Sequence, residues 1–334
     1  MTPPAARTAS DGDTCPACGH AGMKTLCHGG DRLYGTTDKV FLVVECAGCR
    51  LIRLFPRPTP GELQHYYPES YWYDPGGDTA DKLAESWRRL VLRDHVRFVR
   101  KALEGVPEKG PEKGPEKGKV LDVGCGGGLF LREMNLAPER AFGLDFSVNA
   151  AGVAWSTNGV PVACGALPHA PFRPGSFSLI TMFHVLEHLY DPIAYVQAAH
   201  DLLAENGRLV VQVPNAHSWQ FLMFGEAWNG LDIPRHLIDF KESDLLSLLD
   251  YCGFEVVRRK HFSLRDNPAG LATTLAAGLD PMGRRIRGVK DGPSVKLWKD
   301  MAYFALVLAA IPFTLLEAAC GAGATIMVEA RRKP

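Results

Sequence analysis

Three polar side chains that can move protons or bind metal lie close together in the sequence: His184, Glu187 and His188. A neutral imidazole accepts a proton near pH 7, so His184 is the first candidate for a general base. Glu187 and His188 have two open interpretations, because the pair could act on a substrate or could hold a loop through hydrogen bonds. His236, in the stretch Pro-Arg-His, is the second candidate base.

A second group of residues suits the binding of a nucleoside. Asp122 ends a short apolar run and is followed by glycines at positions 124, 126 and 128. Glycines after a strand permit positive φ angles and a close approach of ligand to backbone. Asp145 ends the next apolar run, where a carboxylate can accept both ribose hydroxyls. A helix cap is the other interpretation of Asp145, and the two roles are compatible.

The cysteines form a third group. Cys15 and Cys18, and then Cys46 and Cys49, make two Cys-x-x-Cys pairs that match a four-thiolate zinc site. The apolar run 40–44 predicts a strand leading into the second pair, as in a zinc ribbon. Such a closed site is structural rather than catalytic. Alternative ligands between the pairs are His20, Cys27 and His28.

These residues need a scaffold that brings the ends of several strands together. From residue 119 onwards, apolar runs alternate with amphipathic segments, which favours a parallel sheet with helices on both faces. The expected strands are 120–123, 141–145, 160–164, 207–214, 254–260 and 324–328, with one more, fourth in chain order, that ends just before His184. The expected helices are 79–104, 191–204 and 242–251. Open α/β sheets bind ligands at the carboxyl ends of their strands.

The acid before the glycine loop, the acid ending the second strand and the His-x-x-Glu-His stretch after the fourth resemble class I S-adenosylmethionine-dependent methyltransferases. The ubiquinone-pathway O-methyltransferases have a similar Glu-x-x-Glu-His stretch, for which a divalent metal is proposed; here His184 replaces the first glutamate. Magnesium prefers oxygen ligands, which argues against a hard cation. Ala166 and Ser178 stand where the family commonly has aspartate.

The resemblance implies an α/β, Rossmann-like fold with a seven-stranded sheet, mostly parallel with the last strand antiparallel, and S-adenosylmethionine as cofactor. The implied cofactor contacts are Asp122, Gly124, Cys125, Gly126, Gly128, Asp145, Phe146, Ala166, Leu167, Phe183 and His184. The expected reaction is methyl transfer to a small-molecule acceptor, with oxygen favoured. A zinc ribbon before such a domain resembles bacterial methyltransferases of cell-surface glycans and secondary metabolites. The alternatives are a nicotinamide-dependent oxidoreductase or epimerase, and a non-catalytic zinc-ribbon binding protein.

Composition and patterning divide the chain into expected parts. These are a disordered N-terminus (1–13), a zinc ribbon (14–60), a connector and helix (61–106), a Pro-Glu-Lys-Gly repeat linker (107–118) and a methyltransferase domain (119–334). Formal net charge is zero and the pI is about 7.2, so no nucleic-acid partner is expected. Without an export signal, we expect a cytoplasmic protein with reduced thiols.

Two segments of the last part have open interpretations. The aromatic stretch 215–240 predicts either a lid over the active site or a loop buried by its own aromatic side chains. Residues 264–320 combine a basic loop with an apolar run, 301–316, whose sixteen residues are fewer than the ~20 that span a bilayer. Packing against the sheet is one interpretation of this region, and peripheral membrane contact through 284–316 is the other.

Overall fold

The computed structural model describes residues 14–68, 79–106 and 118–333. Its main sheet has seven strands in the order β10-β11-β8-β7-β4-β5-β6. The strands are β4 (Val120–Val123), β5 (Ala141–Asp145), β6 (Val162–Cys164), β7 (Phe177–Phe183), β8 (Leu203–Pro214), β10 (Phe254–Lys260) and β11 (Thr325–Arg332). The five strands β8, β7, β4, β5 and β6 are parallel to one another. Strand β11 runs antiparallel to both of its neighbours, β8 and β10. The predicted fold class is confirmed.

Side chains alternate between two hydrophobic cores, one on each face of the sheet, because successive strand residues point to opposite faces. Val120 contributes to one core and Leu121 to the other, and Leu179 and Ile180 do the same on β7. The first core is covered by α2 (Thr79–Glu104), α3 (Leu129–Met134) and α4 (Val148–Asn158). The second is covered by α5 (Pro192–Leu202) and α7 (Glu242–Tyr251).

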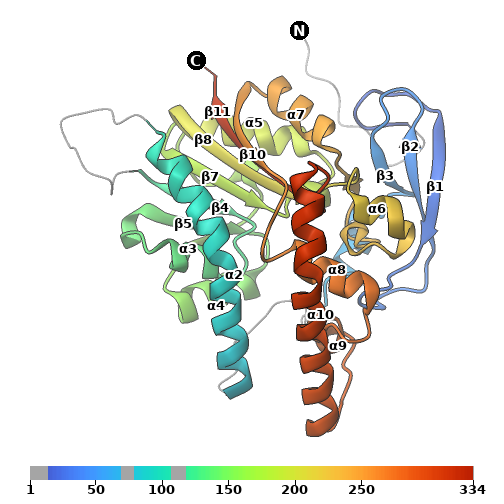
Figure 1. The fold of residues 1–334 in the computed structure, drawn as a ribbon. Helices are drawn as coiled ribbons and strands as arrows, with labels where there is room; N and C mark the ends of the chain where they lie inside the picture. The colour runs from blue at the N-terminus through green and yellow to red at the C-terminus, as the bar shows by residue number, and fades with distance from the viewer. Residues whose placement is uncertain (1–13, 69–78, 107–117, 334) are drawn as a thin grey trace.

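The N-terminal part forms a second, four-stranded antiparallel sheet in the order β1-β2-β3-β9. Strands β1 (Met23–Gly29), β2 (Phe41–Cys46) and β3 (Ile52–Phe55) precede the short helix α1 (Pro60–His65), whereas β9 (Ile238–Asp239) comes from the methyltransferase part. Figure 1 shows this sheet at one side of the molecule, next to α6 (Trp219–Phe224). Its buried residues share a core with α7, so the two sheets are packed together.

Several elements differ from the sequence expectations. Strand β8 starts at Leu203, four residues before the expected start, and β6 is shorter than expected. The stretch 215–240 is folded: it contains α6, two short 3-10 helices and β9, and most of residues 228–240 are buried. The expected disordered N-terminus (1–13), residues 69–78 of the expected connector and the repeat linker up to residue 117 lie outside the described residues.

The C-terminal region is more helical than the sequence predicts. It contains α8 (Asn267–Leu275), α9 (Pro281–Ile286) and α10 (Pro293–Ala319). Helix α10 has 27 residues, so the expected apolar helix of sixteen residues is too short. The sequence pattern misses the extra turns because Lys296, Lys299 and Asp300 interrupt the apolar run without interrupting the helix.

Candidate active site

The loop after β4 turns on three glycines with left-handed backbone, with φ of 71°, 52° and 75° at Gly124, Gly126 and Gly128. A side chain at Gly124 would lie 2.7 Å from Val185, so glycine is required there for packing as well as for conformation. Above Gly126, by contrast, nothing lies within 4 Å of the position that a Cβ would take. The loop therefore leaves open space on the side where a cofactor would lie.

Asp145 connects this loop to the start of the next helix. Its two carboxylate oxygens accept hydrogen bonds from the backbone N–H of Gly126 and of Ser147, both at 2.9 Å. Ser147, rather than Asp145, is the N-cap of α4. Each carboxylate oxygen keeps a further lone pair, so Asp145 can still accept ribose hydroxyls. The neighbouring Phe146 ring is 65% exposed, which leaves a flat apolar surface beside the carboxylate.

Asp122, like Asp145, is only 3% exposed. Burial raises the pKa of Asp122 to about 7, against the hydrogen bond that Thr181 donates at 2.6 Å. Asp122 therefore joins the end of β4, just before the loop, to β7.

The other predicted cofactor residues differ in where their side chains point. The Cys125 thiol packs under Gly143, so only its backbone faces the loop, and the Leu167 side chain is buried in the core. Phe183 packs edge-on against Phe130 and His95 on the α2 side. Ala166 is half-buried at the start of a short 3-10 helix.

His184 follows β7 directly and has a left-handed φ of 56°, which is unusual for a residue other than glycine. Such conformations cost about 1–3 kcal/mol and cluster at functional sites. The strained turn directs Nδ1 to Glu187, whose Oε1 lies 3.1 Å away. Glu187 is 1% exposed and belongs to the 3-10 helix Leu186–His188.

The other ring nitrogen of His184 contacts Gln212, whose amide nitrogen lies 2.8 Å from Nε2 and 2.6 Å from Asp266. The amide can donate to both, which requires an unprotonated Nε2 and a neutral ring. Burial lowers the pKa of His184, but Asp266 and Glu187 raise it to about 9 overall, which favours the imidazolium. In this arrangement the Gln212 amide N–H occupies Nε2, which corresponds to the neutral ring. If the amide turned away, Asp266, 3.6 Å from Nε2, would favour the imidazolium. His184 thus has a high proton affinity and a lone pair covered by Gln212.

His188 and His236 lie beside Glu187, with their rings 4.6 Å apart. Ligand atoms of Glu187, His188 and His236 are all within 4.8 Å of one another. Nδ1 of His236 is 2.8 Å from the Gly230 carbonyl, and Nδ1 of His188 is 3.1 Å from the Arg235 carbonyl. Since a carbonyl only accepts, Nδ1 carries the proton at His236 and Nε2 keeps its lone pair. The same assignment fits His188, where the Tyr67 hydroxyl, 2.9 Å from Nδ1, can accept the same proton.

This arrangement fits a divalent metal ion. Metal-ligating histidines usually donate their other N–H to a carbonyl or carboxylate, as these two do. Oε2 of Glu187 is buried and has no hydrogen-bond partner among the described residues. Burial, with a contribution from His188, lowers the pKa of His236 to about 4, so the ring stays neutral as a ligand must. Two imidazoles and one carboxylate suit zinc or another transition metal better than magnesium.

The ribbon supports this cluster directly. The Leu237 N–H donates to the Glu187 carbonyl at 2.8 Å, and the Leu237 carbonyl accepts from Leu54 of β3 at 3.2 Å. Arg235, which is 0% exposed, makes hydrogen bonds to Asp31 at 2.8 and 3.0 Å. A backbone and side-chain path therefore runs from the N-terminal sheet to the candidate catalytic residues.

The four predicted zinc ligands meet at the edge of the ribbon. The Sγ atoms of Cys15 and Cys49, and those of Cys18 and Cys46, are 3.6 Å apart, and all four lie within 4.8 Å of one another. Four thiolates around zinc at a Zn–S distance of about 2.3 Å would be about 3.8 Å apart, so the cluster fits the ion. The alternative ligands His20, Cys27 and His28 are not part of this group.

Comparisons with known proteins agree with this geometry. A family model described as a methyltransferase domain matches residues 94–259. The ubiquinone biosynthesis O-methyltransferase of Cronobacter sakazakii is 31% identical over 174 residues, which cover 48% of this chain and 71% of that protein. The chain belongs to the S-adenosylmethionine-dependent methyltransferases.

Two further matches, one to a relative and one to a solved structure, cover different shares of the chain. The ubiquinone biosynthesis O-methyltransferase of Pectobacterium carotovorum is 30% identical over 162 residues, covering 45% of this chain and 67% of that protein. A solved methyltransferase structure from Archaeoglobus fulgidus, 15% identical, covers 76% of this chain and 100% of its own with a TM-score of 0.45. S-adenosylmethionine is the cofactor of the family, and the open side of the Gly126 loop with Asp145 and Phe146 fits it.

Three residues around His184 are not predicted from the sequence. Gln212, Asp266 and His95 surround His184, and His95 is fully buried in α2, 3.6 Å from Asp266. Gln212 is a single amide in the apolar run Leu-Val-Val-Gln-Val of β8, which is a signal that could have been noticed. Asp266 follows a strand in an irregular segment, and no periodicity marks it.

Proposed function

We propose that this methyltransferase transfers the methyl group of S-adenosylmethionine to an oxygen of a small-molecule acceptor. The observation that carries the proposal is the position of His184, at the end of β7 beside β4 and its glycine loop. Carboxyl ends of parallel strands at a change in strand order are where open α/β sheets bind their ligands.

The cofactor, when bound, supplies a methyl group that is already activated for transfer. The chain then has to orient it, exclude water and accept a proton from the acceptor. Asp145 would hold the ribose and the glycine loop would lie under the methionine part. His184 would accept the proton at Nε2 once Gln212 gives way, and Glu187 would stabilise the resulting imidazolium through Nδ1.

The choice of acceptor rests on similarity. The most similar relatives reported above are named as O-methyltransferases, which supports an oxygen acceptor. A sugar or secondary-metabolite hydroxyl is our specific proposal, and it comes from the combination of a zinc ribbon with this domain. Zinc at the four cysteines would be structural, because four thiolates leave no open coordination position.

A second way to activate a hydroxyl is suggested by Glu187, His188 and His236. A divalent ion there would lower the pKa of a nearby hydroxyl, and the base would then matter less. In that case His236 would be a ligand rather than a base, which agrees with its buried neutral ring.

The test combines calorimetric binding of S-adenosylhomocysteine with transfer of labelled methyl groups to a panel of nucleotide sugars, phenols and lipids. His184→Gln and His236→Gln are compared with a control, His65→Gln, at an exposed position of α1. We expect both site variants to lose at least about tenfold in turnover with unchanged cofactor affinity, and the control to behave as the wild type. Failure of the wild type to bind S-adenosylhomocysteine would reject the function, and full activity of both site variants would reject their roles.

Metal content separates the two modes of activation. If His236 is a ligand, the purified protein should hold two ions per chain and His236→Gln only one. If the wild type and His236→Gln each hold one ion per chain, His184 and His236 are the candidates for the proton acceptor.

A further inference from the structure

An apolar stripe runs along the outward face of α10. The exposed side chains follow one another at helical spacing, and several are more than 60% exposed. They are Val295, Leu297, Trp298, Met301, Phe304, Leu308, Leu315 and Leu316. A helix on the surface of a globular protein normally turns a polar face to water, so this face requires a different explanation.

The opposite face of α10 is attached to the body of the protein. Val307, Ala310 and Thr314 are buried on that side, and buried Glu317 accepts hydrogen bonds from Gln220 at 2.8 and 3.0 Å. By length and composition α10 could cross a membrane, and with only 22% of its most apolar stretch buried it is not a core helix of the protein. Its attachment along the C-terminal half instead leaves the stripe available to a surface that lies alongside the helix.

Helix α2 lies beside the stripe. Trp87 of α2 packs edge-on against Phe304 of α10, with ring centroids 5.1 Å apart. Figure 1 shows that the N-terminal ends of both helices extend beyond the sheet on the same side. The two helices therefore form one continuous surface, here called the α2–α10 face: the stripe, Trp87, Leu90, Arg93 and Arg97.

The charges on this face are positive. Arg93 and Arg97 of this face are exposed and have no ion-pair partner among the described residues, and the same holds for Lys290 and Lys296 near the start of α10, away from the stripe. The acids nearby are already compensated: Asp291 by Lys299, Asp300 by Arg284 and Asp94 by Lys260. An apolar stripe flanked by unpaired cations is complementary to an anionic bilayer, whose headgroups are negative and whose interior is apolar.

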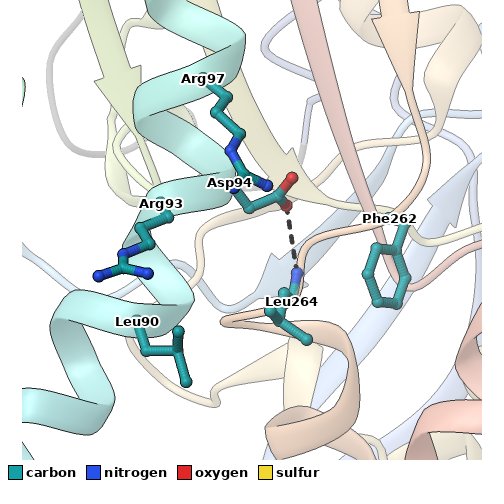
Figure 2. Close-up of a pocket in the computed structure, with 6 residues that line it drawn as sticks. All are labelled: Leu90, Arg93, Asp94, Arg97, Phe262 and Leu264. Carbon is teal, nitrogen blue, oxygen red and sulfur yellow. Dashed lines mark hydrogen bonds between the residues drawn. The ribbon is translucent and has the colours of Figure 1, made fainter.

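A cavity of about 210 Å³ borders the α2 side of the α2–α10 face. Figure 2 shows its lining: Leu90, Arg93, Asp94 and Arg97 from α2, and Phe262 and Leu264 from the segment before Asp266. Asp94 is held by Lys260 and by the Leu264 N–H, so its charge is offset from within the protein. Two arginines above an apolar floor suit a lipid phosphate with part of its chain.

We propose that the α2–α10 face docks on an anionic membrane surface, with the stripe in the interfacial layer and a lipid phosphate at Arg93 and Arg97. The 27-residue helix is about 40 Å long, so it can lie along the bilayer over many lipids. Trp298, near the protruding end, is of the type that favours the membrane–water interface. The docked face is next to Asp266, so the catalytic site is close to the membrane.

The test is sedimentation of the full chain with vesicles of phosphatidylcholine, alone and mixed with phosphatidylglycerol. The wild type should bind the mixed vesicles, and added salt should weaken the binding. Arg93→Gln/Arg97→Gln should lower binding to mixed vesicles about thirtyfold, since each cation near an anionic surface contributes about 1 kcal/mol. Trp298→Glu/Met301→Glu should abolish binding to both kinds of vesicle. These positions are exposed, so folding is unaffected, and a melting curve verifies it.

Tyr251→Glu is the matched control, because Tyr251 is 72% exposed on α7, outside the α2–α10 face; it should bind as the wild type does. Absence of wild-type binding to mixed vesicles would overturn the proposal. So would equal binding by the Trp298→Glu/Met301→Glu variant. A dimer in light scattering that the same variant converts to a monomer would show that a second copy, not a membrane, covers the stripe.

Discussion

Arg235→Met should destabilise the protein strongly, because one buried guanidinium serves two carboxylates. Arg235 is 0% exposed and bonds to Asp31 at 2.8 and 3.0 Å and to Asp232 at 2.7 and 3.0 Å. Removing one partner of a buried ion pair costs about 3–5 kcal/mol. We expect the upper half of that range at pH 8, since both carboxylates lose the same cation.

The loss should depend on pH in a defined direction. Burial raises the pKa of Asp31, but the hydrogen bonds from Arg235 lower this pKa to about 2 in the wild type. The unfolded pKa of an aspartate is near 3.9. The ionised Asp31 therefore contributes its full stability above about pH 3.9, and this contribution is lost as the pH falls towards 2. Without Arg235, burial remains and the folded pKa rises, so a falling pH protonates Asp31 and relieves the cost. The difference between variant and wild type should therefore shrink from pH 8 to pH 5.

Urea unfolding followed by circular dichroism measures the effect. Arg259→Met is the control, because the Arg259–Glu242 pair is 57% and 26% exposed and should contribute less than about 1 kcal/mol. Asp31→Asn/Arg235→Met should recover part of the loss, since it no longer leaves a charge at position 31. A cost for Arg235→Met no larger than for Arg259→Met would refute the reasoning.

Three further outcomes are expected. Cys18→Ser should lower both the zinc content and the melting temperature, and unchanged values would reject the four-thiolate site. Burial lowers the pKa of His95 to about 3, so the folded protein keeps this ring neutral. Below about pH 6.5 the free energy of unfolding of the wild type should therefore fall by up to about 1.4 kcal/mol per pH unit. His95→Gln should flatten this slope in urea titrations. Asp145→Asn should weaken S-adenosylhomocysteine binding about tenfold by calorimetry, and wild-type affinity would contradict its ribose role.

Local patterns in the sequence predict much of the sheet and its cofactor loop. The glycine spacing at 124, 126 and 128 requires left-handed backbone, and all three glycines have it. The cysteine pairs form similar turns, with the residue after each pair, Gly19 and Arg50, at positive φ. Such features depend on a few neighbouring residues, so a single sequence contains them.

Contacts between residues far apart in the chain cannot be predicted from such local patterns. Asp266 reaches His184 from a segment without periodicity, and Gln212 joins them through a strand whose pattern is otherwise apolar. The buried pair of Asp31 and Arg235 connects positions far apart in the chain, and neither residue type suggests burial. The extent of α10 is also not predicted, because Lys296, Lys299 and Asp300 interrupt the apolar run by which the helix is recognised.

Strand β9 has a consequence for how such a protein can be rearranged in evolution. The ribbon ends near residue 60 along the gene, but in space it ends at β9, more than a hundred residues later. Exchanging the ribbon at its genetic boundary would separate β3 from β9 and Asp31 from Arg235. A viable chimaera must therefore carry the segment around β9 together with the ribbon.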